Sequence, residues 1–133
     1  VILDLGLPDG DGEVLLARLR QRHAIPLIVI SARQAEGHKI RLLDAAGVDA
    51  VIVQDLGLAR MVKAVAPRLK LHASTQMTIT SPEGLRFARR LGLDLAVLAR
   101  ELSLRDLERF QREDNSLPLE VFVHGALCVA YSG

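Results

Sequence analysis

Polar side chains that could bind a ligand follow short apolar runs at several points along the chain. They stand where a strand would end: Asp4, Ser31, Gln54 with Asp55, Ser74 with Thr75 and Gln76, Arg100 with Glu101, and His124. The carboxyl ends of parallel strands meet at one edge of a sheet, so these side chains would form a polar rim there. The rim could be a pocket for a small anion or a metal ion. It could equally be the polar border at which strands leave an apolar core.

Two further positions carry side chains with possible chemistry. His72 lies inside an apolar run, either as a hydrogen-bonded core histidine or as a ligand of the same pocket. Cys128, the single cysteine, follows His124 by four residues. A cysteine protease needs a base within hydrogen-bond reach of its thiolate, which this spacing does not establish. One cysteine excludes an internal disulfide and indicates a reducing, cytoplasmic compartment.

The segments between these polar positions alternate between strand-like and helix-like patterns. Apolar runs predict strands at about 1–5, 27–30, 50–53, 69–73, 95–98 and 119–123, and helical spacing predicts helices at about 13–22, 40–46, 56–65, 82–91 and 104–112. Ser81 and Ser103 are expected as helix N-caps, and Gly47 and Gly92 as helix ends. The alternation predicts an α/β fold with a mainly parallel sheet, in a single domain over residues 1–133.

Two architectures are compatible with this alternation. We expect a flavodoxin-like open sheet; the alternative is a partial TIM barrel, which a homodimer could close. In either case Leu71, Val97 and Val121 are expected in central strands.

Composition and charge exclude several classes of protein. Half of the 133 residues are hydrophobic, which is not typical of a disordered chain. Apolar runs are far shorter than the roughly 20 residues of a membrane span, so no membrane partner is expected. A net charge of +1 and an aromatic share of 3% give no support for nonspecific nucleic-acid binding. Two groups of arginines are expected on solvated helix faces: Arg18, Arg20 and Arg22, and Arg86, Arg89 and Arg90.

The first third of the chain resembles a response-regulator receiver domain. The resemblance rests on VILDLGLPDGDG at 1–12, PLIVISAR at 26–33 and KIRLLDAAG at 39–47. It implies that Asp4 is the phospho-accepting aspartate and Ser31 the hydroxyl that senses the phosphoryl group. Gln54 and Asp55 stand where a receiver has its lysine, and the acidic pair that holds Mg²⁺ is absent. Asp4 alone would hold Mg²⁺ only weakly.

Residues from about 45 to 133 resemble the U32 family of collagenase-like peptidases. The resemblance rests on AGVDAVIVQDLG at 46–57, LHASTQM at 71–77, LARELSL at 98–104 and EVFVHGALCVAYSG at 120–133. It implies a TIM-barrel core, a role in RNA base hydroxylation and an iron–sulfur cluster held by four cysteines. Cys128 would be the first of these ligands. One cysteine cannot complete such a site, so no cofactor is expected in this chain by itself.

The two resemblances meet near Gly47, which indicates a chimera of a receiver segment and a barrel segment. Three functions follow from this. The chain could be a truncated, inactive member of the peptidase family, with RNA as a partner implied by that resemblance. It could be a receiver-like phosphoacceptor module, or a recombined α/β scaffold without function.

Overall fold

A computed structural model describes residues 1–4, 11–30 and 37–123, apart from the side chains of Asp4 and His38. The chain divides into two compact units, Val1–Leu71 and His72–Gly133. Each unit is described by itself below. The predicted domain organisation stays a prediction.

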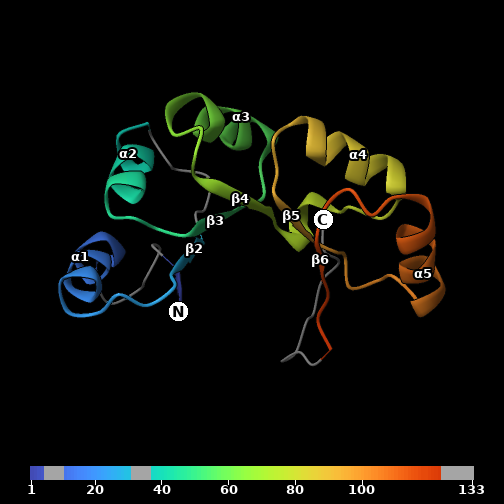
Figure 1. The fold of residues 1–133 in the computed structure, drawn as a ribbon, viewed down its shortest axis with the longest axis horizontal. Helices are drawn as coiled ribbons and strands as arrows, with labels where there is room; N and C mark the ends of the chain where they lie inside the picture. Colours follow the sequence, from blue (N-terminus) through green and yellow to red (C-terminus); the bar gives the residue numbers. More distant parts are fainter. Residues whose placement is uncertain (5–10, 31–36, 124–133) are drawn as a thin grey trace. The chain divides into compact units, whose positions relative to one another are not determined.

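Strands and helices alternate along the described residues (Figure 1). The strands are β1 (Ile2–Asp4), β2 (Ile28–Ile30), β3 (Ala50–Val53), β4 (Lys70–Ala73), β5 (Leu95–Val97) and β6 (Leu119–Glu120). The helices are α1 (Gly12–Arg22), α2 (Gly37–Ala45), α3 (Leu56–Val65), α4 (Pro82–Arg90) and α5 (Leu104–Glu113), with a 3₁₀ helix η1 at Thr75–Met77. The pairs β1–β2, β2–β3, β4–β5 and β5–β6 are all parallel. The predicted fold class, alternating βα units with an open, mainly parallel sheet, is confirmed.

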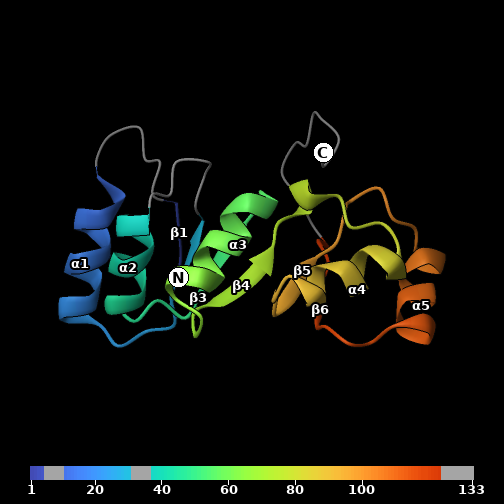
Figure 2. The same ribbon diagram turned by 90° about the horizontal axis from the view of Figure 1, so that it is seen from above.

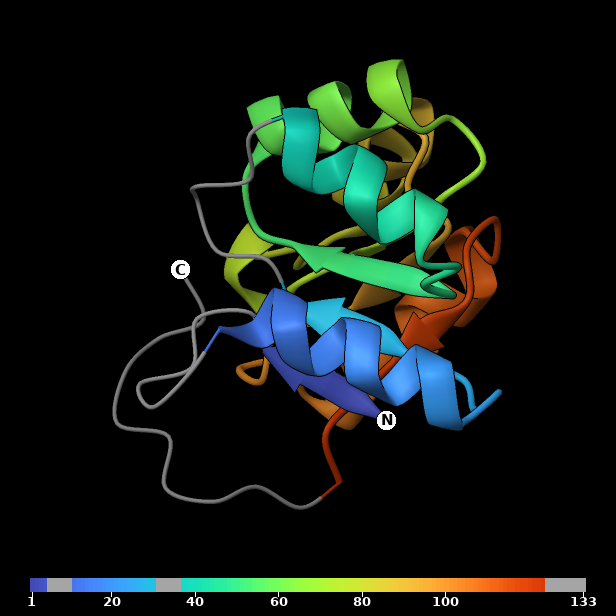
Figure 3. The same ribbon diagram turned by 90° about the vertical axis from the view of Figure 1, so that its left-hand side faces the viewer.

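In the first unit, β1, β2 and β3 pair in chain order. Leu3 lies opposite Val29, and Val29 opposite Val51, so these three side chains share one sheet face. All three are at most 5% exposed. Figures 1 and 3 show α1 and α2 together on one side of these strands. This side is the expected one, because right-handed crossovers between neighbouring parallel strands place successive helices on the same face.

In the second unit, the strand pairs are β4 with β5 and β5 with β6. Ala73 lies opposite Ala96, and Ala96 opposite Leu119. Ala73 and Ala96 are completely buried, as are Leu85 of α4 and, within 1%, Phe110 of α5. Large helix side chains and small strand side chains therefore form the core of this unit.

Local sequence signals fix the helix ends as predicted. The Ser103 hydroxyl accepts a hydrogen bond from the Asp106 N–H, and the Asp106 carboxylate accepts one from the Ser103 N–H, which completes a capping box. The Ser81 hydroxyl accepts from the Gly84 N–H at 3.2 Å. Gly47 and Gly92 have φ of +65° and +86°, a conformation that glycine adopts without strain.

One expectation fails at the end of a strand, and one element was not expected. β6 stops at Glu120, and Val121 is 40% exposed, so its expected place in a central strand is wrong. Leu71 and Val97 do lie in strands and are buried. The 3₁₀ helix after β4 has no counterpart in the expected elements. Among the described residues, none of the helices is both long and apolar enough to cross a bilayer.

Candidate functional site

Two rim positions of the first unit, Gln54 and Asp55, follow β3 directly. Asp55 is the N-cap of α3: its Oδ1 accepts a hydrogen bond from the Leu58 N–H at 2.8 Å. This bond satisfies one of the otherwise unpaired donors of the first helical turn. Gln54 is half-buried at the end of the strand. The Asp55 carboxylate therefore has a structural role.

The rim positions of the second unit lie at the ends of two paired strands. Ser74 follows β4 and caps η1, where its hydroxyl accepts from the Gln76 N–H at 3.3 Å. Gln76 is exposed. Arg100 and Glu101 follow β5 and are also exposed. Because β4 and β5 are parallel neighbours, these four residues belong to one edge of the sheet.

The remaining candidates lie largely outside the described residues. Asp4 is opposite Ile30 in the pairing of β1 with β2, but its side chain is not described. Ser31, His124 and Cys128 lie outside the described ranges. The phosphoacceptor and iron–sulfur roles of these residues stay predictions. Within the described ranges, no group of three His, Cys, Asp or Glu side chains is placed to hold a metal ion.

His72 and Glu120 share the second unit's other sheet face. His72 lies opposite Leu95, and Val97 opposite Glu120, while Leu95 and Val97 are two residues apart on β5. Glu120 was missing from the sequence candidates. The sequence nevertheless indicated this residue, because Glu120 is a charged residue in a run otherwise typical of a strand.

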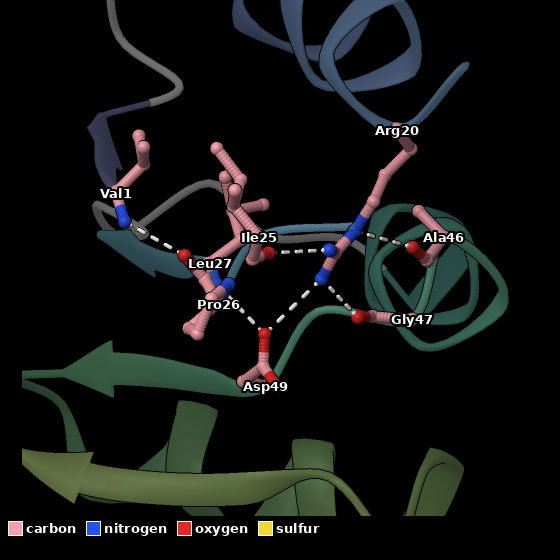
Figure 4. A network of polar contacts seen from close by, with 8 residues as sticks. All are labelled: Val1, Arg20, Ile25, Pro26, Leu27, Ala46, Gly47 and Asp49. Atoms are coloured by element: carbon pink, nitrogen blue, oxygen red, sulfur yellow. Dashed lines mark hydrogen bonds and ion pairs between the residues drawn. The ribbon is translucent and has the colours of Figure 1, made fainter. Parts of the chain in front are cut away.

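Arg20 of α1 makes a hydrogen-bond network at the amino ends of β2 and β3, away from the rim (Figure 4). Its guanidinium donates to the carbonyls of Ala46 (Nε, 3.0 Å), Ile25 (Nη1, 2.7 Å) and Gly47 (Nη2). Nη2 also contacts the Asp49 carboxylate at 3.1 Å. The expectation that Arg20 lies on a solvated face is wrong, because three backbone carbonyls converge on it.

Asp49 joins this network to β2. Its Oδ2 accepts a hydrogen bond from the Leu27 N–H at 2.7 Å as well as from Arg20. The Leu27 N–H, followed by the Arg20 guanidinium, lowers the pKa of Asp49. The network thereby connects α1 to the loops that precede β2 and β3. Its role is structural.

The arginines of α4 are also more engaged than expected. Arg86 contacts Glu83 at 2.7 Å and the buried carboxylate of Asp114 at 3.6 Å. The Arg90 guanidinium lies 5.9 Å from the centre of the Phe87 ring. Arg86 therefore balances a buried charge, which was not expected from its place in a basic helix.

A shallow groove of about 130 Å³ lies between α1 and α2, which run side by side (Figure 2). Its lining is apolar except for Glu13 and Lys39, which approach to 3.9 Å. The apolar lining residues are Leu16, Ala17, Leu42, Leu43 and Ala46. Apart from that surface ion pair, the groove presents no group that could do chemistry.

Comparison with known proteins places the chain in a family. The sequence profile described as "Peptidase family U32" matches residues 29–133. The chain belongs to this family. The solved structure titled "The Structure of the U32 Peptidase Mk0906" superposes on 90% of this chain and 58% of its own, with a TM-score of 0.68 and 20% identity. At 20% identity, this match shows that the two proteins share a fold.

Curated relatives of this U32 chain include RNA hydroxylation proteins. The "23S rRNA 5-hydroxycytidine C2501 synthase" of Escherichia coli is 45% identical over 87 residues, which are 65% of this chain and 13% of that protein. The "tRNA hydroxylation protein P" of the same organism is 39% identical over 87 residues, which are 65% of this chain and 19% of that protein. The U32 chain is thus related to tRNA and rRNA hydroxylation proteins and spans less than a fifth of either.

The receiver resemblance is also supported. The "KDP operon transcriptional regulatory protein KdpE" of Escherichia coli is 37% identical over 120 residues, which are 90% of this chain and 48% of that protein. This match reaches well beyond residues 1–47. The U32 profile in turn begins before residue 45. A boundary near Gly47 stays a prediction.

Proposed function

We propose that this U32 chain supplies part of the substrate-binding surface of an RNA hydroxylation protein and does not hydroxylate RNA by itself. The observation that carries the proposal is the identity to two RNA hydroxylation proteins over about two thirds of the chain. The chain spans 19% of one of these proteins and 13% of the other, and we expect the complete reaction to require further groups.

The second unit offers a surface suited to this role. Its exposed polar residues, Gln76, Arg100 and Glu101, lie at the carboxyl ends of parallel strands, where α/β proteins bind ligands. His72 and Glu120 lie on the adjoining sheet face. Side chains of this kind can hydrogen-bond the edges of unpaired bases in single-stranded RNA.

An iron–sulfur cluster does not fit the donors of this chain alone. Such clusters are held by about four cysteine thiolates, and the chain has one cysteine, Cys128. We therefore expect the isolated chain to be colourless after anaerobic incubation with iron and sulfide. A brown product with stoichiometric iron that is absent from Cys128→Ser would contradict this.

The proposed function is tested by nucleoside analysis of ribosomal RNA. In Escherichia coli lacking the 5-hydroxycytidine synthase, we expect the chain alone to restore no 5-hydroxycytidine. A synthase whose matching segment is replaced by the corresponding segment of this chain should restore it. A soluble hybrid protein that gives no 5-hydroxycytidine would refute the proposed role, whereas restoration by the chain alone would refute its inactivity.

The response-regulator match supports phosphoacceptance at Asp4 as a second candidate. Receiver chemistry needs a metal ion and a cation to neutralise the transferring phosphoryl group. In receiver domains this cation is a lysine, and Gln54 stands at the position where the resemblance places it. We therefore expect no phosphorylation by acetyl phosphate and Mg²⁺. Mass spectrometry that locates a phosphoryl group on Asp4 would favour this candidate. Failure of both the hybrid protein and the labelling would leave a scaffold without function.

Self-association is a further part of the proposal. Ile2 and Ile30 of the first unit are 64% and 38% exposed, and exposed apolar side chains on a sheet favour association. Light scattering over a range of concentrations would detect a homodimer. A constant monomer mass would exclude it.

A further inference from the structure

The groove between α1 and α2 of the first unit is large enough for a side chain of another molecule. Its volume is about 130 Å³, and its lining is apolar apart from Glu13 and Lys39. Two of the lining residues, Ala17 of α1 and Leu42 of α2, are exposed, so the groove opens to solvent. An apolar cavity of about 150 Å³ takes up a benzene ring. The groove therefore has room for one large apolar side chain of a partner.

The helix surface beside the groove is apolar as well. Val14 of α1 is 49% exposed and precedes Ala17 by three residues. Ala45 of α2 is exposed and follows Leu42 by three residues. Residues three apart on a helix are neighbours, so each helix carries an exposed apolar pair next to the groove. We call these four residues the groove face; apolar side chains grouped in this way are typical of an interaction site.

Two arginines flank the groove face. Arg18 follows Val14 by four residues, and Arg41 precedes Ala45 by four residues, so each lies beside an apolar residue of the face. Both arginines are exposed. Within the described residues of the chain, neither of them takes part in an ion pair. Both are therefore available to a partner.

The acidic residues of the two helices do not balance these arginines. Glu13 is paired with Lys39 at 3.9 Å, at one end of the groove. Asp44 follows Leu42 by two residues, and residues two apart on a helix do not face the same side. The unbalanced charge beside the groove face is therefore positive. A second copy of this chain would bring the same two arginines to the contact, whereas an acidic partner would pair with both.

We propose that the groove face binds an amphipathic helix of a partner protein, with acidic residues on both sides of its apolar stripe. A leucine or phenylalanine of this helix fills the groove, and its carboxylates pair with Arg18 and Arg41. The small side chains of Ala17 and Ala45 let its backbone approach closely. Apolar residues three and four positions apart anchor a helix that binds in this way. The inference concerns the first unit and does not depend on the role proposed for the second.

The test is an NMR titration of the isotope-labelled chain with a synthetic peptide of about 15 residues. Leucines three and four positions apart form its apolar stripe, and glutamates flank the stripe. This peptide should shift the amide signals of α1 and α2 and leave those of α4 and α5 unchanged. Lysines in place of the glutamates should weaken binding about tenfold, because like charges then meet across the contact. Alanines in place of the leucines should also weaken it about tenfold.

Variants of the chain assign the effect to the groove face. Leu42→Glu puts a carboxylate into the apolar lining and should weaken binding of the acidic peptide about tenfold. The double variant Arg18→Glu, Arg41→Glu should reverse the preference, so that the lysine peptide binds more tightly than the glutamate peptide. Arg60→Glu is the matched control, because it reverses the charge of an exposed arginine on α3 and should bind like the parent chain.

The spectrum of each variant reports whether it is folded, so a loss of binding cannot be mistaken for unfolding. No shifts, shifts outside α1 and α2, or equal binding of the acidic and basic peptides would each overturn the inference. Two other occupants have their own outcomes, which would also overturn it: displacement of the peptide by oligouridine indicates RNA, and concentration-dependent shifts of α1 and α2 without peptide indicate a second copy. None of these results bears on whether the hybrid synthase is active, so the proposed function is judged separately.

Discussion

Replacement of Arg20 by methionine should destabilise the first unit more than is usual for a substitution near the protein surface. The Arg20 guanidinium is held by three backbone carbonyls and one carboxylate, and its side chain is 21% exposed. Methionine retains the aliphatic stem but donates no hydrogen bond. Each bond contributes about 0.5–1.5 kcal/mol net, and water can reach the exposed carbonyls in the variant. We expect a loss of about 2–4 kcal/mol in the free energy of unfolding.

This loss is a substantial part of the stability of a domain, which is about 5–15 kcal/mol. For a chain of this length it corresponds to a fall in Tm of roughly 10 °C. Urea denaturation followed by circular dichroism measures the free energy. Hydrogen exchange of amides in β2 and β3 shows whether the loss falls in the first unit.

Two further variants separate the carbonyl contacts from the ion pair. Arg20→Lys keeps the charge but lacks the planar fork of donors, so it should lose most of the same stability. Arg18→Met removes an exposed arginine of the same helix and should change stability by less than about 0.5 kcal/mol.

The dependence of the stability loss on salt concentration distinguishes the carbonyl contacts from the ion pair. An exposed ion pair between Arg20 and Asp49 alone would contribute under about 1 kcal/mol and would be screened at high ionic strength. A loss this small in Arg20→Met, or one that disappears in concentrated salt, would refute the reasoning.

Three other predictions follow from single contacts. Val97→Asp should abolish cooperative melting, because an unpaired buried carboxylate costs several kcal/mol. Val121→Asp is the control and should melt like the parent, since Val121 is 40% exposed. A soluble Val97→Asp variant that melts cooperatively would contradict the strand assignment. Ser103→Ala should lower the unfolding free energy by about 1 kcal/mol through loss of the capping box, and an unchanged urea midpoint would argue against that cap. The lowered pKa of Asp49 stabilises the fold at pH values above the ordinary pKa of 3.8, and this stabilisation is lost as the pH falls through the lower folded pKa. Urea denaturation at neutral and acid pH should therefore show a smaller acid-induced loss in Asp49→Asn than in the parent chain, and equal losses would count against the network.

The sequence by itself determined the features that depend on near neighbours. Helix ends at Ser81, Ser103 and Gly92 were predictable because a cap bonds to backbone only a few residues away. The alternation of strand and helix patterns was sufficient for the α/β class. Asp55 was recognised as a polar strand end, but its bond to Leu58 makes it a cap rather than a ligand.

Only the tertiary structure decided which distant residues meet. Arg20 resembles its neighbours in a basic helix, yet it contacts carbonyls up to 27 residues away, which no local pattern specifies. His72 and Glu120 are brought to one face by the register of three strands, and a shift of one residue would move Glu120 to the other side. Register depends on the packing of whole strands, so the sequence could place these side chains on strands but could not pair them.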